Sequence, residues 1–132
     1  VQDDARFADS LRQLALFDFI VNNADRKSGH CLIGADERLW AIDHGICFHT
    51  EYKLRTVIWE FSGEPVDVAL LGDLKTLRQQ LTDPERTVAQ QLCRLLSDEE
   101  RKALHTRLQQ LIRNASYPAP QPHRRNYPWP PV

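Results

Sequence analysis

Two stretches decide the fold of this chain: F-D-F-I-V-N-N-A-D-R-K-S-G-H-C-L at residues 17–32 and L-W-A-I-D-H-G at residues 39–45. The first passes from an apolar run into a polar loop that carries Asp25 and His30. The second is a short apolar run that ends at Asp43. Two carboxylates brought to neighbouring loops, with a metal-capable side chain between them, are what phosphoryl transfer from Mg-ATP needs.

Outward from these stretches, the apolar periodicity predicts an α+β fold. Apolar spacings of three and four predict helices, and short apolar runs around a polar turn predict a β-hairpin. The first helix should end at Asn22 and Asn23, because asparagine favours turns over helix interiors. The expected elements are a helix over 4–21, strands over 30–34 and 39–43, and helices over 66–81, 82–96 and from 97 onward.

Polar residues at the helix starts predict where each helix begins. Asp3 or Asp4 is expected to cap the first helix. T-D-P-E at residues 82–85 and S-D-E-E at residues 97–100 both match the capping box, in which a cap residue and an acid three positions later bond to each other's backbone. The sequence therefore predicts that a new helix starts at each motif.

The pair D-R-K-S-G-H at residues 25–30 and I-D-H-G at residues 42–45 resembles two loops of the phosphatidylinositol 3-/4-kinase-like superfamily. Its members carry D-R-H-x-x-N in the catalytic loop and I-D-F-G or I-D-H-G in the metal-binding loop. Small bacterial phosphatidylinositol-kinase-like proteins are the most similar in style, and HipA-type toxin kinases are more distant. The resemblance implies a mostly helical, protein-kinase-like C-terminal lobe over residues 1–115, with a small β-hairpin at the catalytic and metal site.

The resemblance also divides that lobe. It implies a catalytic loop at 22–30, a metal-binding loop at 42–45, an activation-loop-like segment at 46–66 where the acceptor would dock, and a helical part at 67–115. Gly45 would let the chain swing away from Asp43. The five glycines are too far apart for a Gly-rich phosphate loop, and the chain contains no Met. We therefore expect a piece of a longer kinase that lacks the N-terminal lobe.

By the same resemblance, Asp25 would orient or deprotonate the acceptor hydroxyl, and Asp43 would bind Mg²⁺. Arg26 follows the catalytic aspartate as in the family and would support the loop by pairing with a carboxylate. Lys27 replaces the usual histidine and would lie near the phosphates of ATP. His30 stands where the family has asparagine. Either it still contacts the metal, which would favour Mn²⁺, or it weakens a second metal position.

Histidine and cysteine crowd the same region, so a zinc site is an alternative. Their spacing matches no common zinc pattern, and the three cysteines are better explained as reduced core thiols of a cytoplasmic protein. The residues that a zinc site would draw on are His30, Cys31, His44, Cys47 and His49.

The bulk composition narrows the partners. A length of 132 residues fits one domain, and a net charge of −1 argues against a nucleic-acid partner, which would need a basic face. The sequence has neither an apolar run of membrane-spanning length nor a signal peptide. A nucleotide and an acceptor of unknown class (lipid, protein or small molecule) are the partners that the resemblance implies.

Residues 116–132 form a proline-rich tail that can be neither helix nor central strand. Its aromatic residues Tyr117, Tyr127 and Trp129 would allow it to strap across the domain surface. A disordered terminus is an equal alternative, and a polyproline partner site is a third.

Together these features predict an ATP-dependent phosphotransferase that uses ATP and Mg²⁺, or Mn²⁺. A pseudokinase, or another non-catalytic binding module, is the alternative, because two family positions are substituted. A metal-dependent phosphoesterase built on Asp25, His30 and Asp43 is the third candidate.

Overall fold

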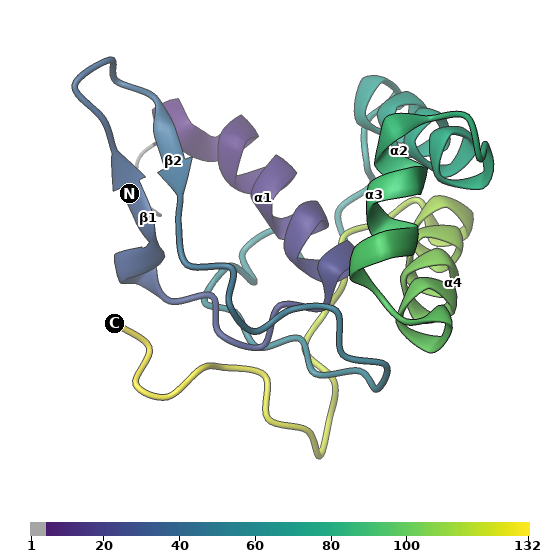
Figure 1. Cartoon of the computed structure of the whole chain (residues 1–132). Helices are drawn as coiled ribbons and strands as arrows, with labels where there is room; N and C mark the ends of the chain where they lie inside the picture. The colour runs from purple at the N-terminus through teal and green to yellow at the C-terminus, as the bar shows by residue number, and fades with distance from the viewer. Residues whose placement is uncertain (1–4) are drawn as a thin grey trace.

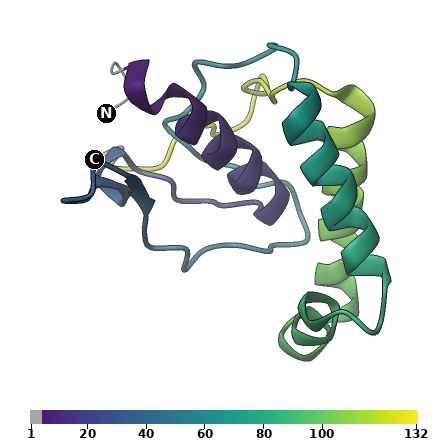
Figure 2. The same cartoon turned by 90° about the horizontal axis from the view of Figure 1, so that it is seen from above.

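The computed structural model describes residues 5–132, and over this range the chain has an α+β fold with four α-helices and a two-stranded antiparallel sheet (Figure 1). Helix α1 lies between the β-hairpin on one side and the remaining helices on the other, in both views (Figures 1 and 2). The elements are η1 (Ala5–Phe7), α1 (Ala8–Val21), η2 (Ser28–His30), β1 (Cys31–Ile33), β2 (Leu39–Ala41), α2 (Val68–Thr82), α3 (Thr87–Leu95) and α4 (Asp98–Asn114).

Helix α1 is the centre of the hydrophobic core. Because the chain packs against it from both sides, its apolar residues are buried around more than one face, as in a core helix. The helix ends at Asn22, which adopts the left-handed conformation with φ 57°, so the expected end is confirmed. It begins after the short η1 turn, and the cap predicted at Asp3 or Asp4 lies outside the described residues.

The predicted β-hairpin is present and slightly shorter than expected. Strands β1 and β2 pair antiparallel, with Leu32 opposite Trp40. Alternate residues of a strand point to opposite faces. Cys31, Leu39 and Ala41 therefore face the core and pack in it, whereas Leu32 and Trp40 lie on the outer face.

Helices α2, α3 and α4 pack on one another, and α4 also packs against α1. Helix α2 starts two residues later than predicted, because the Asp67 side chain accepts a hydrogen bond from the Leu70 N–H and caps it. The capping box at the start of α4 is confirmed, with Ser97 and Glu100 bonding to each other's backbone.

The capping box predicted at residues 82–85 is wrong. Asp83 ends α2, and its carboxylate accepts from the Glu85 N–H while its carbonyl accepts from the Arg86 N–H. The motif therefore forms a tight turn of the Asx type, and α3 starts only at Thr87.

The three cysteines are free thiols, as expected, but they are not all in the core. Cys31 is buried, Cys47 is half-buried and Cys93 is exposed on α3. The prediction of a core thiol is therefore wrong for Cys93.

The proline-rich tail straps across the domain, from the end of α4 to the hairpin (Figures 1 and 2). Of the aromatic anchors that were expected, only Tyr117 is buried, whereas Tyr127 and Trp129 are 53% and 78% exposed. The tail is held instead by backbone hydrogen bonds and by the buried Pro128. None of the helices in residues 5–132 has both the length and the apolar character needed to cross a bilayer.

Candidate functional site

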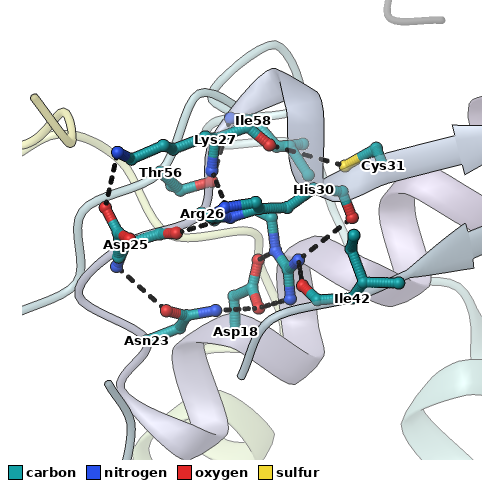
Figure 3. A network of polar contacts seen from close by, with 10 residues as sticks. All are labelled: Asp18, Asn23, Asp25, Arg26, Lys27, His30, Cys31, Ile42, Thr56 and Ile58. Atoms are coloured by element: carbon teal, nitrogen blue, oxygen red, sulfur yellow. Dashed lines mark hydrogen bonds and ion pairs between the residues drawn. The ribbon is translucent and has the colours of Figure 1, made fainter. Parts of the chain in front are cut away.

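A buried ion pair holds the loop that follows α1 (Figure 3). Arg26 and Asp18 are both completely buried. The guanidinium donates from Nε to Oδ2 of Asp18 at 2.9 Å and from Nη2 to Oδ1 at 3.0 Å, which is the two-bonded fork that arginine makes with carboxylates. Its Nη1 donates to the Ile42 carbonyl at 3.0 Å. Arg26 therefore ties together helix α1, the predicted catalytic loop and the end of the hairpin.

This placement gives Arg26 the supporting role that was expected of it, in which it pairs with a carboxylate. Burial alone lowers the pKa of Arg26, but the hydrogen bond and the charge of Asp18 outweigh it, and the pKa lies above its usual value. Asp18 was not among the site residues predicted from the sequence. A signal was present, because an aspartate inside the apolar run F-D-F-I-V can be buried only with a cation to pair with it.

The two asparagines after α1 fix the turn and also the segment that faces it. The Asn23 side chain accepts from the Asp25 N–H and donates to Asp18. The Asn22 side chain donates to the carbonyls of His49 and Glu51 and accepts from the N–H of residue 53. The loop before the site and the chain after it are therefore locked to one another.

Asp25, Lys27 and His30 lie together in one turn (Figure 3). The Lys27 ammonium is 3.8 Å from the Asp25 carboxylate, and their side chains are 20% and 25% exposed. Nδ1 of His30 lies 2.9 Å from the Asp25 carbonyl oxygen and 3.3 Å from the Lys27 backbone nitrogen. The turn thus pairs the Asp25 carboxylate with the Lys27 ammonium and holds the His30 imidazole against its own backbone.

Asp43 reaches this turn from the end of the hairpin. Its Oδ2 is 3.3 Å from Nε2 of His30, and its side chain is 62% exposed. Asp43 itself adopts the left-handed conformation, with φ 62°. The prediction that Gly45 redirects the chain is therefore wrong, since Asp43 carries the unusual backbone angle. The structure thus brings together four predicted residues, Asp25, Lys27, His30 and Asp43.

His30 and Asp43 are the two side chains of this turn that could be neighbouring ligands of one metal ion. Adjacent ligands of an octahedral ion bound at about 2.1 Å are about 3.0 Å apart, close to the observed 3.3 Å. Among residues 5–132, no group of three or more histidine, cysteine, aspartate or glutamate side chains is arranged to hold a metal. That finding speaks against the zinc alternative, whereas Mg²⁺ needs only one or two protein ligands besides phosphates and water.

The two faces of the hairpin offer different surfaces next to this turn. The outer face carries Leu32, Trp40 and Ile42, which are 45%, 51% and 42% exposed. The Ile42 N–H donates to the His30 carbonyl, so this apolar surface leads to the polar turn. On the inner side, an open cleft of about 650 Å³ lies between the hairpin and the segment of η1 and α1, and its lining includes Arg6, Arg38 and His44.

The comparisons with known proteins found one curated relative at high similarity. The chain is 41% identical over 128 residues to Protein Rv2133c of Mycobacterium tuberculosis, a match that covers 97% of this chain and 43% of the relative. The chain thus spans less than half the length of that relative. No family model matches the chain, and no solved structure matches it.

Proposed function

We propose that this chain carries the catalytic and metal-binding loops of an ATP-dependent phosphotransferase of the phosphatidylinositol 3-/4-kinase-like type. The observation that carries the proposal is the contact between His30 and Asp43. It joins two motifs that are separate in the sequence, and it does so beside the Asp25 and Lys27 pair. The proposal is also supported by the α+β arrangement, in which a hairpin bears the metal-binding aspartate.

In this function Asp25 accepts the proton of the acceptor hydroxyl or orients it. It is partly exposed, so an acceptor can reach it, and its backbone is fixed by Asn23. Lys27 neutralises charge on the transferred phosphoryl group, from a position where it also pairs with Asp25. Positioning and electrostatic stabilisation of this kind account for most of phosphoryl-transfer catalysis.

Asp43 and His30 would hold the metal ion, which neutralises the phosphates when it is bound. The carboxylate oxygen suits Mg²⁺, and the imidazole nitrogen adds affinity for Mn²⁺. The apolar outer face of the hairpin would receive the base of the nucleotide, since Leu32 and Ile42 are exposed beside the same turn.

The test is a calorimetric titration of ATP into the full chain, with Mg²⁺ and then with Mn²⁺. Asp43→Asn should weaken metal-dependent binding at least tenfold, because the amide lacks the anionic oxygen. Asparagine tolerates the left-handed backbone of Asp43, so the variant should stay folded. Asp73→Asn, at an exposed position of α2, is the matched control and should bind as the unmodified chain does. Equal affinity in Asp43→Asn and Asp73→Asn would refute the assignment.

A second experiment separates catalysis from binding. Asp25→Asn should retain metal-dependent ATP binding and lose phosphoryl transfer, measured as release or transfer of the γ-phosphate. Binding without any turnover in the unmodified chain would favour the pseudokinase alternative. That alternative is supported by Lys27 and His30, which replace the histidine and asparagine of the family pattern. Hydrolysis of phosphoesters without ATP would favour the phosphoesterase. A cytoplasmic location, where the free thiols stay reduced, goes with this proposal.

A further inference from the structure

The predicted catalytic loop is held from two sides, and the second side is the C-terminal tail. From the core, Asp18 holds Arg26 and Asn23 holds Asp25. From the surface, the Ser28 N–H donates to the Pro131 carbonyl at 3.0 Å, and the Ser28 hydroxyl lies 3.4 Å from the same oxygen. A distant segment of the chain, in the tail, thus reaches the turn that carries Lys27 and His30.

The tail is itself anchored one segment away from the loop. The Asn126 carbonyl accepts from the Thr56 N–H at 3.0 Å and from Nε1 of Trp59 at 3.1 Å. The Asn126 side chain holds that carbonyl in place, since its oxygen accepts from the Gln121 N–H and its nitrogen donates to the Gln121 and Arg124 carbonyls. The neighbouring Pro128 is buried.

The segment at 54–57 connects this anchor to the loop. It accepts from the Arg26 N–H at 3.0 Å and donates to the carbonyls of Asn23 and Arg26. The loop, the segment at 54–57 and Asn126 therefore lie side by side and share backbone hydrogen bonds. Residues 126–131 are thus held at both ends, at Asn126 by the Thr56 N–H and at Pro131 by the Ser28 N–H.

We propose that residues 126–131, which we call the strap, position the turn that binds the nucleotide and the metal. The inference rests on the function proposed above and adds a positioning element to it. Asp25 and Arg26 are already fixed from the core, so the strap acts on the next residues along the loop. It fixes the first amide of η2, which lies between Lys27 and His30. Loss of the strap contact should therefore weaken nucleotide binding more than the chemical step.

Ser28→Pro tests this directly, because proline removes the amide that the strap accepts from. Lys27 has ψ 160°, the extended conformation that a residue before proline prefers. Ser28 is the first residue of a helical turn, where proline is favoured. The substitution should thus spare the loop backbone. Ser28→Ala keeps the amide and is the matched control.

We expect Ser28→Pro to raise the Kd for ATP in Mg²⁺ about fivefold, the equivalent of one hydrogen bond, and to change kcat for ATP turnover less than twofold. Ser28→Ala keeps the amide bond and loses only the longer hydroxyl contact with Pro131, so it should raise the Kd less than Ser28→Pro does. Asn126→Ala, which frees the anchoring carbonyl, should reproduce the binding loss. Gln121→Ala is its control, because Gln121 contacts Asn126 through backbone atoms that alanine retains, and it should leave ATP binding unchanged.

Amide hydrogen exchange provides a readout that does not depend on ATP. The backbone amides of His30 and Cys31 donate to the carbonyls of Lys27 and Ser28. Their protection should fall in Ser28→Pro and fall less in Ser28→Ala. If the unmodified chain binds no ATP, the proposed function fails and exchange alone decides on the strap. Unchanged exchange in Ser28→Pro overturns the strap proposal in either case. If the unmodified chain does bind ATP, an unchanged ATP affinity in both Ser28→Pro and Asn126→Ala also overturns the strap proposal.

Discussion

Replacing Asp18 by asparagine should be among the most damaging conservative changes in this chain. The variant keeps the shape of the side chain and removes the charge that faces Arg26. Both residues are completely buried, so water cannot replace the lost partner. Removing one member of a buried, hydrogen-bonded ion pair costs about 3–5 kcal/mol. Since a domain of this size is stable by about 5–15 kcal/mol, Asp18→Asn should lose a large share of its free energy of unfolding.

The double variant Asp18→Leu, Arg26→Met should be far more stable than Asp18→Leu alone or Arg26→Met alone, each of which leaves one buried charge or donor group without its partner. It removes both charges and leaves neither uncompensated, which is often close to neutral for the pair itself. The remaining cost comes mainly from the Ile42 carbonyl and the Asn23 amide, each of which loses a partner. The His30 carbonyl loses only a long contact of 3.5 Å and keeps the Ile42 N–H. At about 1 kcal/mol for each lost hydrogen bond, the double variant should lose about 2 kcal/mol. A coupling energy of at least about 3 kcal/mol should therefore appear in the double-mutant cycle.

Urea unfolding followed by circular dichroism measures these free energies, provided that the slope with urea is unchanged among the variants. Asp9→Asn is the matched control, because Asp9 lies on the same helix and pairs with Arg12 at 3.5 Å while 98% exposed. Exposed pairs of this kind contribute at most about 1 kcal/mol. A loss below about 1 kcal/mol in Asp18→Asn, or additive single variants, would refute the reasoning.

Two further changes test the surroundings of the site. Asn22→Ala removes three hydrogen bonds to the segment at 49–53 and forces alanine into the left-handed region. Urea unfolding should show a loss of about 4 kcal/mol, about 3 from the hydrogen bonds and about 1 from the backbone. Asn22→Gly should be about 1 kcal/mol less damaging, since glycine accepts that backbone conformation, and equal losses would contradict the role of φ. Burial raises the pKa of Cys47 from 9.0 to about 11, so the folded state keeps a proton that the unfolded state loses first. Stability should therefore be full below pH 9 and fall as the pH approaches 11, by no more than about 3 kcal/mol and by less to the extent that water screens the half-buried thiol. Cys47→Ala should flatten that decline, and an unchanged pH profile would exclude this thiol as its source.

Local signals predicted the parts of the fold that local chemistry determines. The end of α1 at Asn22 and the start of α4 at Ser97 were predicted correctly, because a left-handed asparagine and a capping box act within a few residues. The same reasoning failed at residues 82–85. There the capping pattern coincides with the end of α2, and the Asp83 carboxylate bonds to the nearer Glu85 amide in a turn.

Contacts between distant positions could not be predicted from local patterns. The motifs indicated Asp25, Lys27, His30 and Asp43, and the structure brings them together. The motifs did not say what holds those residues in place. That role belongs to Asp18, and to a tail whose aromatic residues suggested the wrong anchors.

The buried pair of Asp18 and Arg26 also explains how a partly exposed site can be well ordered. A buried ion pair adds little net stability over apolar residues of the same size, so stability alone does not account for it. Leucine and methionine could fill the same space, but neither could donate to the carbonyl of Ile42 beside Asp43. Arg26 therefore fixes the distance between the two loops and not only their packing. It follows that the double variant should lose only about 2 kcal/mol of its free energy of unfolding and yet, under the proposed function, bind Mg-ATP more weakly. A double variant that binds normally would show that other contacts are enough to hold the loops in register.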